Sequence, residues 1–272
     1  MAVWHVTRRS SSNSEALSTE IDYSPVGGRL TRMTDSKTAP DWLAKDCLDV
    51  GVFTNRLDEM LAFWQDTVGL TFDHMLPLGG GVRQHRHDFE TAILKLNHTR
   101  AELSPRSLGG YRRLIIGKAG LAEPVDLIDP DGNPVRLVPK GQGGLDHWAI
   151  EVATASKDRF FYHYETCLGL PRDLQYPIAV RCGRSLIIGI EDPDLADETD
   201  SADMMRLGYR YTTMQVFKVD SVHSQAVARG AQEGAAPKTL GETARISFLK
   251  DASGNWMELS QRASITGSLM PG

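Results

Sequence analysis

Cysteine is scarce in this sequence. Its 272 residues include three, Cys47, Cys167 and Cys182, with no C-x-x-C spacing. A disulfide framework or a structural zinc site is therefore not expected. We expect the protein to lie in a reducing, cytoplasmic compartment. No apolar run approaches the roughly 20 residues that span a bilayer, and no apolar segment near the start has the pattern of a secretory signal. The net charge of −5 gives no electrostatic reason to bind nucleic acid or an anionic membrane.

The first 40 residues differ in composition from the rest. They are rich in serine and arginine and are broken by Pro25-Val-Gly-Gly28, with little apolar periodicity. Such a segment buries too little apolar surface to fold by itself. We expect residues 1–40 to be a flexible extension, the first 32 of them lying upstream of a natural start at Met33; a transit peptide is the alternative. Residues 263–272 are expected to form a C-terminal tail.

The remaining sequence repeats one pattern. A strand at 48–53, an amphipathic helix at 57–68, a hairpin around Gly79-Gly-Gly81 and a strand at 92–96 make one β-α-β-β-β unit. A second unit, 111–138, has a short or missing helix. A third begins at Leu145 with a helix over 157–168, and a fourth begins near Thr212 with a helix that ends at Gly230. A repeated supersecondary unit indicates the fold, and we therefore interpret it before any single residue.

Two short motifs recur within this repeat. The helix of the first unit ends in Phe63-Trp-Gln-Asp-Thr-Val-Gly-Leu70, and that of the third in His163-Tyr-Glu-Thr-Cys-Leu-Gly-Leu170. The pattern D-x-x-G-N precedes the last strand of the second unit and of the fourth. Over residues 46–262 the chain resembles the vicinal-oxygen-chelate superfamily, which includes glyoxalase I, extradiol dioxygenases and bleomycin-binding proteins. The resemblance implies an α+β fold of two tandem open-barrel domains, each of paired β-α-β-β-β modules, at 46–140 and 144–262.

The resemblance also implies a metal site. In that superfamily the ligands come from the first strands of modules and from a glutamate on a last strand, and the ion would be Fe²⁺, Mn²⁺ or Zn²⁺. Carried over to this sequence, the metal ligands are His147 and Glu258. The position of a second ligand is occupied by Met214, a poor ligand for a hard cation. The matching positions of the first domain are Val50 and Arg136, so that domain is expected to have no metal site.

Other residues are candidates for contact with a substrate. His85 and His87 alternate on one strand face, and Thr212 shares a face with Met214. Tyr211 is placed to hydrogen-bond a substrate oxygen and is predicted, with Glu258, to be catalytic. Phe248 stands ten residues before Glu258, where a ring-cleaving relative has a tyrosine. The residues predicted to line the substrate are His85, His87, Thr212, Met214 and Phe248. The acidic loop 191–200 is expected to be solvated, with a lid as the alternative.

Three functions remain open at this point. The first is a metal-dependent lyase or isomerase of the glyoxalase type acting on a small oxygen-bearing metabolite, with a metal as Lewis acid, or with Glu258 as the base if no metal binds. The second is an extradiol-type dioxygenase with an incomplete ligand triad. The third is a metal-free protein that binds a small molecule. The expected partners are a small-molecule substrate and a second copy in a homodimer, with no nucleic acid and no membrane.

Overall fold

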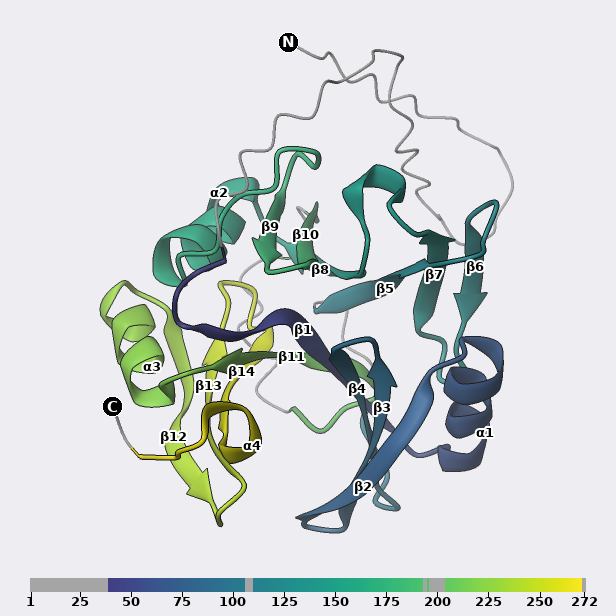
Figure 1. The fold of residues 1–272 in the computed structure, drawn as a ribbon, viewed down its shortest axis with the longest axis horizontal. Helices are drawn as coiled ribbons and strands as arrows, with labels where there is room; N and C mark the ends of the chain where they lie inside the picture. The colour runs from purple at the N-terminus through teal and green to yellow at the C-terminus, as the bar shows by residue number, and fades with distance from the viewer. Residues whose placement is uncertain (1–38, 106–109, 193–194, 196–203, 271–272) are drawn as a thin grey trace. The chain divides into compact units, whose positions relative to one another are not determined.

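The computed structural model describes residues 39–105, 110–192, 195 and 204–270. Residues 1–38 of the predicted N-terminal extension and most of the acidic loop lie outside these residues. Within them, none of the helices combines the length and the apolar character that crossing a membrane requires. The class is α+β, as predicted: two mixed β-sheets accompanied by a few short helices. Figure 1 shows the two sheets and the helices at their margins.

The larger sheet has eight strands. Their order is β12-β13-β14-β11-β1-β4-β3-β2. Four come from the first repeat unit: β1 (Leu43–Thr54), β2 (Thr71–Gly79), β3 (Val82–Phe89) and β4 (Ala92–His98). Four come from the last unit: β11 (Gly208–Val216), β12 (Gln232–Leu240), β13 (Ala244–Lys250) and β14 (Trp256–Arg262). The edge strand β12 was not foreseen, because its alternation of polar and apolar residues is weak.

The smaller sheet has six strands in the order β6-β7-β5-β8-β10-β9. The second unit supplies β5 (Tyr111–Lys118), β6 (Val125–Ile128) and β7 (Pro134–Pro139). The third unit supplies β8 (Trp148–Thr154), β9 (Ala179–Cys182) and β10 (Ser185–Glu191). A short 3₁₀ turn, Gln142–Gly144, connects the two units.

The repeat units combine in an order that the sequence did not indicate. Strand β1 of the first unit pairs antiparallel with β11 of the fourth, and β5 of the second pairs antiparallel with β8 of the third. Each sheet therefore takes strands from both of the expected ranges 46–140 and 144–262, and residues 140–144 do not separate the sheets. The repeat pattern identifies each unit from neighbouring residues. Which two units share a sheet depends on strand pairings between residues far apart in the sequence.

The repeated helix ends have one structural explanation. Helix α1 (Leu57–Ala62) and helix α2 (Lys157–Phe161) each continue into a π-helical turn, Phe63–Thr67 and Tyr162–Cys167. In both, the leucine after the glycine donates its N–H back six residues, Leu70 to the Trp64 carbonyl and Leu170 to the Tyr164 carbonyl. Gly69 and Gly169 have φ of 83° and 74°, a left-handed conformation that favours glycine.

The D-x-x-G-N motif is a turn held by its aspartate. Asp129 Oδ1 accepts hydrogen bonds from the backbone N–H groups of Asp131 and Asn133, at 3.0 and 2.8 Å. Asp251 Oδ1 accepts them from Ser253 and Asn255, both at 2.9 Å. The turn starts β7 and β14, and so sets the register of the last strand of each unit.

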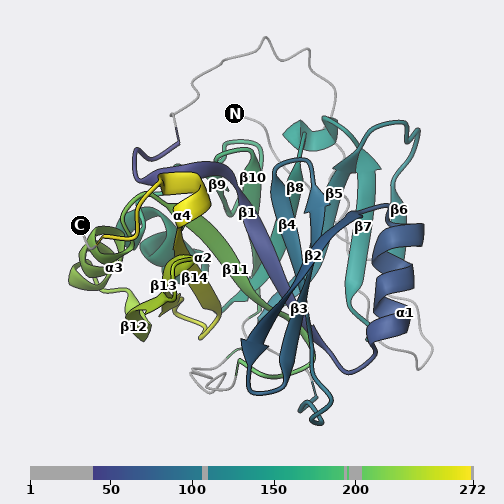
Figure 2. The same ribbon diagram turned by 60° about the horizontal axis from the view of Figure 1, so that its bottom comes forward.

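The apolar core lies on the faces that the two sheets share with the helices. Leu48, Val50 and Val52 of β1 and Leu94 and Leu96 of β4 belong to one buried cluster with Trp148 and Ile150 of β8. Trp148 Nε1 also donates to the Leu48 carbonyl at 3.0 Å. Figure 2 shows α1, from the first unit, beside β6 and β7 of the smaller sheet. Helix α3 (Val219–Ala228) buries Val219, Val222 and Ala226, and the expected tail starts with a short helix, α4 (Ala263–Thr266).

Candidate functional site

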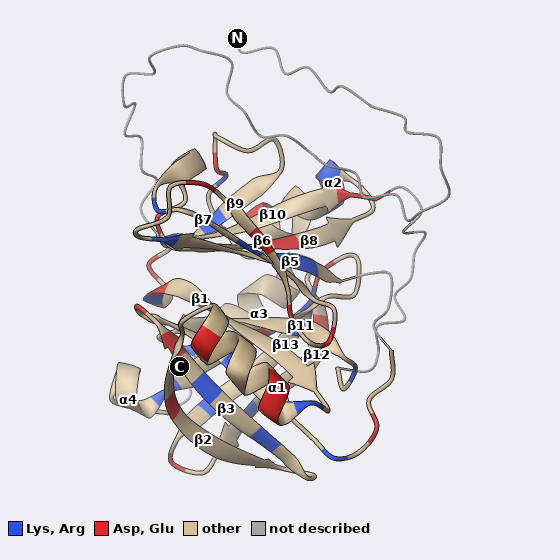
Figure 3. Cartoon of the chain, turned by 90° about the vertical axis from the view of Figure 1, so that its right-hand side faces the viewer, with Lys and Arg blue, Asp and Glu red and all other residues tan. Residues whose placement is uncertain are grey.

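The opposite face of the larger sheet is polar although it is buried. Because side chains alternate along a strand, residues between the core leucines and valines point to this other face. Figure 3 shows blue bands of basic residues along β3 in this sheet. We call this the polar face; its central residues are Asp49, Gln84, Arg86, Lys95, Asn97, Tyr211, Thr213, Gln215 and Glu258, all of them buried.

A lysine and a glutamate form the centre of the polar face. Lys95 Nζ on β4 lies 2.7 Å from Glu258 Oε2 on β14 and 2.6 Å from Thr213 Oγ1 on β11. The Thr213 hydroxyl in turn donates to Glu258 Oε2 at 2.7 Å. The Lys95 side chain is 3% exposed and that of Glu258 is 11% exposed. Burial lowers the pKa of Lys95, and the charge of Glu258 opposes this effect.

The contacts at this centre leave two groups available. Both hydrogen bonds that reach Glu258 end on Oε2, so Oε1 has no partner among the described residues. An ammonium group has three N–H donors, and Lys95 uses two of them. A proton acceptor and a charged donor are thus free side by side.

A second carboxylate, Asp49 on β1, completes the charged cluster. It accepts from Lys45 Nζ at 2.7 Å, from Gln215 Nε2 at 3.0 Å and from the Ile93 N–H at 2.9 Å. Burial by itself raises the pKa of Asp49, but the charges of Lys45 and Lys95 outweigh it and the net pKa is lowered. Asp49 therefore carries a negative charge beside Lys95.

Tyr211 closes the centre on one side. Its hydroxyl oxygen accepts from Gln84 Nε2 and Asn97 Nδ2, both at 3.2 Å, and Lys95 Nζ lies 5.4 Å from its ring centroid. Burial raises the pKa of Tyr211 far above its usual range, so the hydroxyl keeps its proton. The ring lies directly over Gly51, where a Cβ would come within 2.2 Å of it. Only glycine leaves room for the tyrosine here.

Three of the predicted site residues meet on this face. Phe248 is the cross-strand partner of Glu258, and the Tyr211 and Phe248 ring centroids lie 6.3 Å apart. Glu258, Tyr211 and Phe248 are thus brought together, and their predicted roles in catalysis and substrate contact stay predictions.

The predicted metal pair of His147 and Glu258 is not brought together. His147 lies just before β8 of the smaller sheet, fully buried, with its Nδ1 3.3 Å from Ser185 Oγ and its ring against Phe89. Its Nε2 has no hydrogen-bond partner among the described residues. Burial lowers its pKa to about 4. The sequence placed both residues in one domain because it paired the third unit with the fourth.

The other predicted lining residues face away from the polar face. His85 and His87 share one strand face, as expected, but they lie opposite Leu96 and Leu94 of the core. His87 is buried next to Gln65, with 3.1 Å between the Nε2 atoms. Met214 belongs to the apolar core, and the Thr212 hydroxyl lies 3.1 Å from that of Tyr111 on the smaller sheet. A one-residue difference in register moves a side chain to the other face of a sheet.

The donor set of the polar face does not fit a divalent cation. Its two carboxylates each hold a lysine, Asp49 with Lys45 and Glu258 with Lys95. An ammonium is a cation without lone pairs, so it repels a metal ion and cannot ligate one. Within the part of the chain that the structure describes, no group of three or more His, Cys, Asp and Glu side chains is placed to hold a metal. The expected divalent metal has no fitting donor set here.

The corresponding face of the smaller sheet differs in chemistry. Ile115, Val138, Ala149 and Ile188 form part of an apolar cluster on it. Its buried carboxylate, Glu151, forms a bidentate pair with Arg113, at 2.7 and 3.1 Å. Arg136 lies 3.6 Å from Asp126 at the margin of the same sheet. An arginine that occupies both carboxylate oxygens leaves no free base, so the larger sheet is the better candidate.

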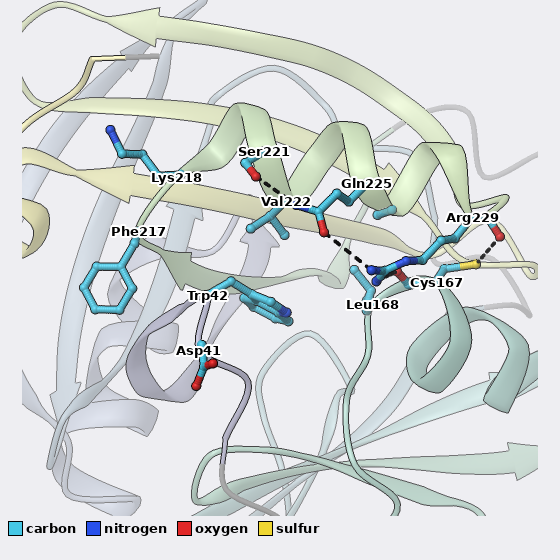
Figure 4. A pocket seen from close by; sticks show the side chains of 11 residues that line it. Asp41, Trp42, Cys167, Leu168, Phe217, Lys218, Ser221, Val222, Gln225 and Arg229 are labelled. Carbon is cyan, nitrogen blue, oxygen red and sulfur yellow. Dashed lines mark hydrogen bonds between the residues drawn. The ribbon is translucent and has the colours of Figure 1, made fainter. Parts of the chain in front are cut away.

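A cavity of about 290 Å³ lies elsewhere, between the start of β1, the end of the second π turn and α3 (Figure 4). Leu168, Val222 and Ala226 give it an apolar wall, and Lys218 and Arg229 stand at its margins. Its cysteine, Cys167, donates to the Arg229 carbonyl at 3.2 Å, and burial raises the pKa of the thiol. No acid and base are paired in this lining, and it carries no chemistry that we can assign.

Sequence reasoning missed Lys95, Asp49, Thr213 and Arg86. A signal for the first two was present: Lys95 lies between Leu94 and Leu96, and Asp49 lies between Leu48 and Val50. When a charged residue lies between two apolar residues of a strand, its side chain points to the other face of the sheet. Such a residue indicates that the face opposite the apolar core is polar. The pattern does not show which strand will face which.

Comparison with known proteins supports the fold. No protein-family model and no curated protein sequence matches the chain. Among solved structures, a point variant of glyoxalase I from Zea mays matches with TM-score 0.61 and 12% identity, over 81% of this chain and 95% of that one. A candidate dioxygenase from Bacillus subtilis matches with TM-score 0.59 and 11% identity, over 85% and 92%. The chain therefore has the fold of these proteins, as its resemblance to the vicinal-oxygen-chelate superfamily implied.

Proposed function

We propose that the protein is an isomerase or lyase that moves a proton on a small oxygen-bearing metabolite, with Lys95 and Glu258 as its acid–base centre. The observation that carries the proposal is the free Oε1 of Glu258 next to the third N–H of Lys95. A buried base and a buried charged donor, aligned before substrate arrives, are what proton abstraction next to a carbonyl requires.

In the proposed reaction Glu258 Oε1 removes a proton from the carbon next to the substrate carbonyl. The C–H bond breaks, its electron pair moves onto the carbonyl oxygen, and the Lys95 ammonium donates a hydrogen bond to that oxygen. Return of the proton to a neighbouring atom gives the isomer, and departure of a leaving group gives the lyase product. One preorganised donor contributes about two to three powers of ten to such a step.

Thr213 and Tyr211 position this centre. Thr213 donates to Glu258 Oε2 and accepts from Lys95, so it fixes which carboxylate oxygen stays free. Tyr211 limits the volume over Lys95, because its ring lies over Gly51. Neither residue exchanges a proton in the proposal.

The other functions considered find less support in the site. An extradiol dioxygenase uses two histidines and one carboxylate around iron, and the polar face supplies two carboxylates that each hold a lysine. A protein that only binds its ligand would need no free base. The likeness to the candidate dioxygenase is one of fold.

The test is proton exchange with solvent. Pyruvate, glycerate, oxaloacetate and dihydroxyacetone would be incubated with the protein in D₂O, and carbon-bound deuterium followed by NMR. We expect exchange on at least one compound, lost by a factor of at least 100 in Glu258→Gln. The matched control is Glu151→Gln, the buried carboxylate of the smaller sheet, which should keep wild-type exchange. Equal exchange in both variants would refute the proposal, and binding without exchange would establish the binding protein instead.

A further inference from the structure

Two arginines of the polar face have no acidic partner. Arg86 on β3 is 5% exposed, yet its guanidinium makes one hydrogen bond, from Nη1 to Gln84 Oε1 at 3.0 Å. Its Nε is buried and without a hydrogen-bond partner among the described residues. Arg262 on β14 is half-buried. Among the described residues, neither guanidinium lies within ion-pair distance of a carboxylate; arginines that do include Arg56, Arg112, Arg113, Arg136, Arg172, Arg181, Arg184 and Arg245.

The two arginines lie on either side of the Lys95–Glu258 centre. Arg86 is the cross-strand partner of Lys95 in the pairing of β3 with β4. Arg262 lies four residues after Glu258 on β14, and therefore on the same face of the strand. Arg86 and Lys95 are therefore direct neighbours on this face, and Arg262 follows Glu258 by two same-face positions along β14.

The charges of these residues affect one another. Burial lowers the pKa of Arg262, and the like charge of Arg86 lowers it further, while Glu258 and Asp49 act in the opposite direction. The charge of Arg86 also lowers the pKa of Lys95. Effects of this kind require short distances between charges inside a protein. Arg86, Lys95 and Arg262 therefore form one group of mutually interacting cations on the face that carries Glu258.

An unpaired buried guanidinium is costly, and proteins almost always pair it. Here the described residues supply no such partner, while the donors border a site that has a base and a charged donor. From this we infer that the substrate is a small monocarboxylate, with its carboxylate bound between Arg86 and Arg262 and its reacting carbon at Lys95 and Glu258. This inference rests on the function proposed above and names its substrate class.

A carboxylate suits the site better than a phosphate. A guanidinium binds a planar carboxylate through two parallel hydrogen bonds. Asp49 and Glu258 lie buried at the centre of the face. Asp88 lies two residues from Arg86 on β3; burial and the charge of Asp73 raise its pKa, and the charge of Arg86 acts in the opposite direction without an ion pair between the two. These carboxylates limit how much negative charge a ligand can bring, which favours a monoanion over a phosphate dianion.

The experiment is calorimetric titration of the full-length protein with sodium pyruvate, and separately with acetate and inorganic phosphate, at one ionic strength kept constant with sodium chloride. We expect pyruvate to bind at least tenfold more tightly than phosphate. Arg86→Gln and Arg262→Gln should each weaken pyruvate at least tenfold, and Arg86→Lys, which keeps the charge but loses the paired donors, should weaken it less. Arg245→Gln, at an arginine held by Asp220, is the matched control and should bind as wild type does.

Folding of the variants provides a second measurement. Because the buried charge of Arg86 lacks an acidic partner, unliganded Arg86→Gln should melt at or above the wild-type temperature. A drop of several degrees would show that the guanidinium is structural and would overturn the inference. Absence of binding by all three anions, or unchanged pyruvate affinity in both arginine variants, would overturn it too.

The two proposals fail in different ways. If pyruvate binding needs both arginines but Glu258→Gln keeps proton exchange, the carboxylate site stands and the proposed acid–base centre falls. If Glu258→Gln loses exchange on a neutral compound such as dihydroxyacetone and no carboxylate binds, the centre stands and the substrate class is wrong.

Discussion

Lys95 Nζ lies 2.7 Å from Glu258 Oε2, across 163 positions of sequence and between the first and last repeat units. The pair joins β4 to β14 through the two first strands, β1 and β11, that lie between them in the sheet. Burying two charges costs several kcal/mol for each ion unless they remain together. The pair therefore helps to fix which two units share a sheet, in addition to the chemistry proposed for it.

The stability of the pair gives a first prediction. Lys95→Met leaves Glu258 buried without its counter-charge, so we expect the free energy of unfolding to fall by about 3–5 kcal/mol. Adding Glu258→Gln to the same chain should restore most of this loss, because the remaining groups are neutral. Urea denaturation of the two variants measures both values. Equal losses in the single and double variants would mean that the two charges do not interact.

A second prediction concerns the contact of Gly51 with Tyr211. Gly51→Ala places a methyl group 2.2 Å from the tyrosine ring, so the ring has to move. Overpacking of this kind costs about 1–3 kcal/mol. The double variant with Tyr211→Leu should recover part of the stability by giving the methyl group space. Thermal melts of Gly51→Ala and of the double variant measure this recovery. If alanine destabilised β1 for a reason other than the contact with the ring, Tyr211→Leu would not restore any stability.

Much of the fold could be predicted from the sequence, because it depends on interactions between residues that are close together in the sequence. The helix ends at Gly69 and Gly169 and the D-x-x-G-N turns each depend on neighbours within six residues, so their repetition predicted the units correctly. The resemblance pointed to Glu258 and Phe248, and Tyr211 was chosen because it lies in the strand of Met214; their predicted roles stay predictions. These features need no knowledge of which units pair.

The metal pair required that knowledge. His147 and Glu258 were matched because the resemblance implied a domain built from the third and fourth units, whereas β8 pairs with β5 and β14 with β11. Pairing partners depend on the summed packing of many distant residues, and no short pattern records them. The buried Lys95 was overlooked for the same reason, since its partner lies in another unit. The homodimer and the N-terminal extension stay predictions.

A third prediction follows from the buried histidines. Burial lowers the pKa of His87, His147 and His163 to about 4 each, against 6.5 in the unfolded chain. Between these values the unfolded state binds more protons, so stability is complete above pH 6.5 and falls as the pH falls toward 4. At pH 5 the loss should be about 2 kcal/mol per histidine.

His163→Phe isolates one of these histidines. His163 is 3% exposed, and its Nε2 has no hydrogen-bond partner among the described residues, so an apolar ring can replace it. The variant should lose less stability than wild type between pH 7 and pH 5, by about 2 kcal/mol. Urea denaturation at the two pH values gives the difference. An equal loss of stability in the variant and in wild type would show that His163 takes up a proton in the folded protein as readily as in the unfolded chain.

We propose that proton transfer depends on the Lys95–Glu258 pair, with the lysine ammonium and not a metal ion supplying the positive charge at the reacting oxygen. The most direct measurement is proton exchange by protein dialysed against EDTA and assayed in metal-free buffer. We expect unchanged exchange, no gain when Mn²⁺, Zn²⁺ or Fe²⁺ is added, and loss of exchange in Lys95→Met. Exchange that disappears on dialysis and returns with one of these ions would contradict it.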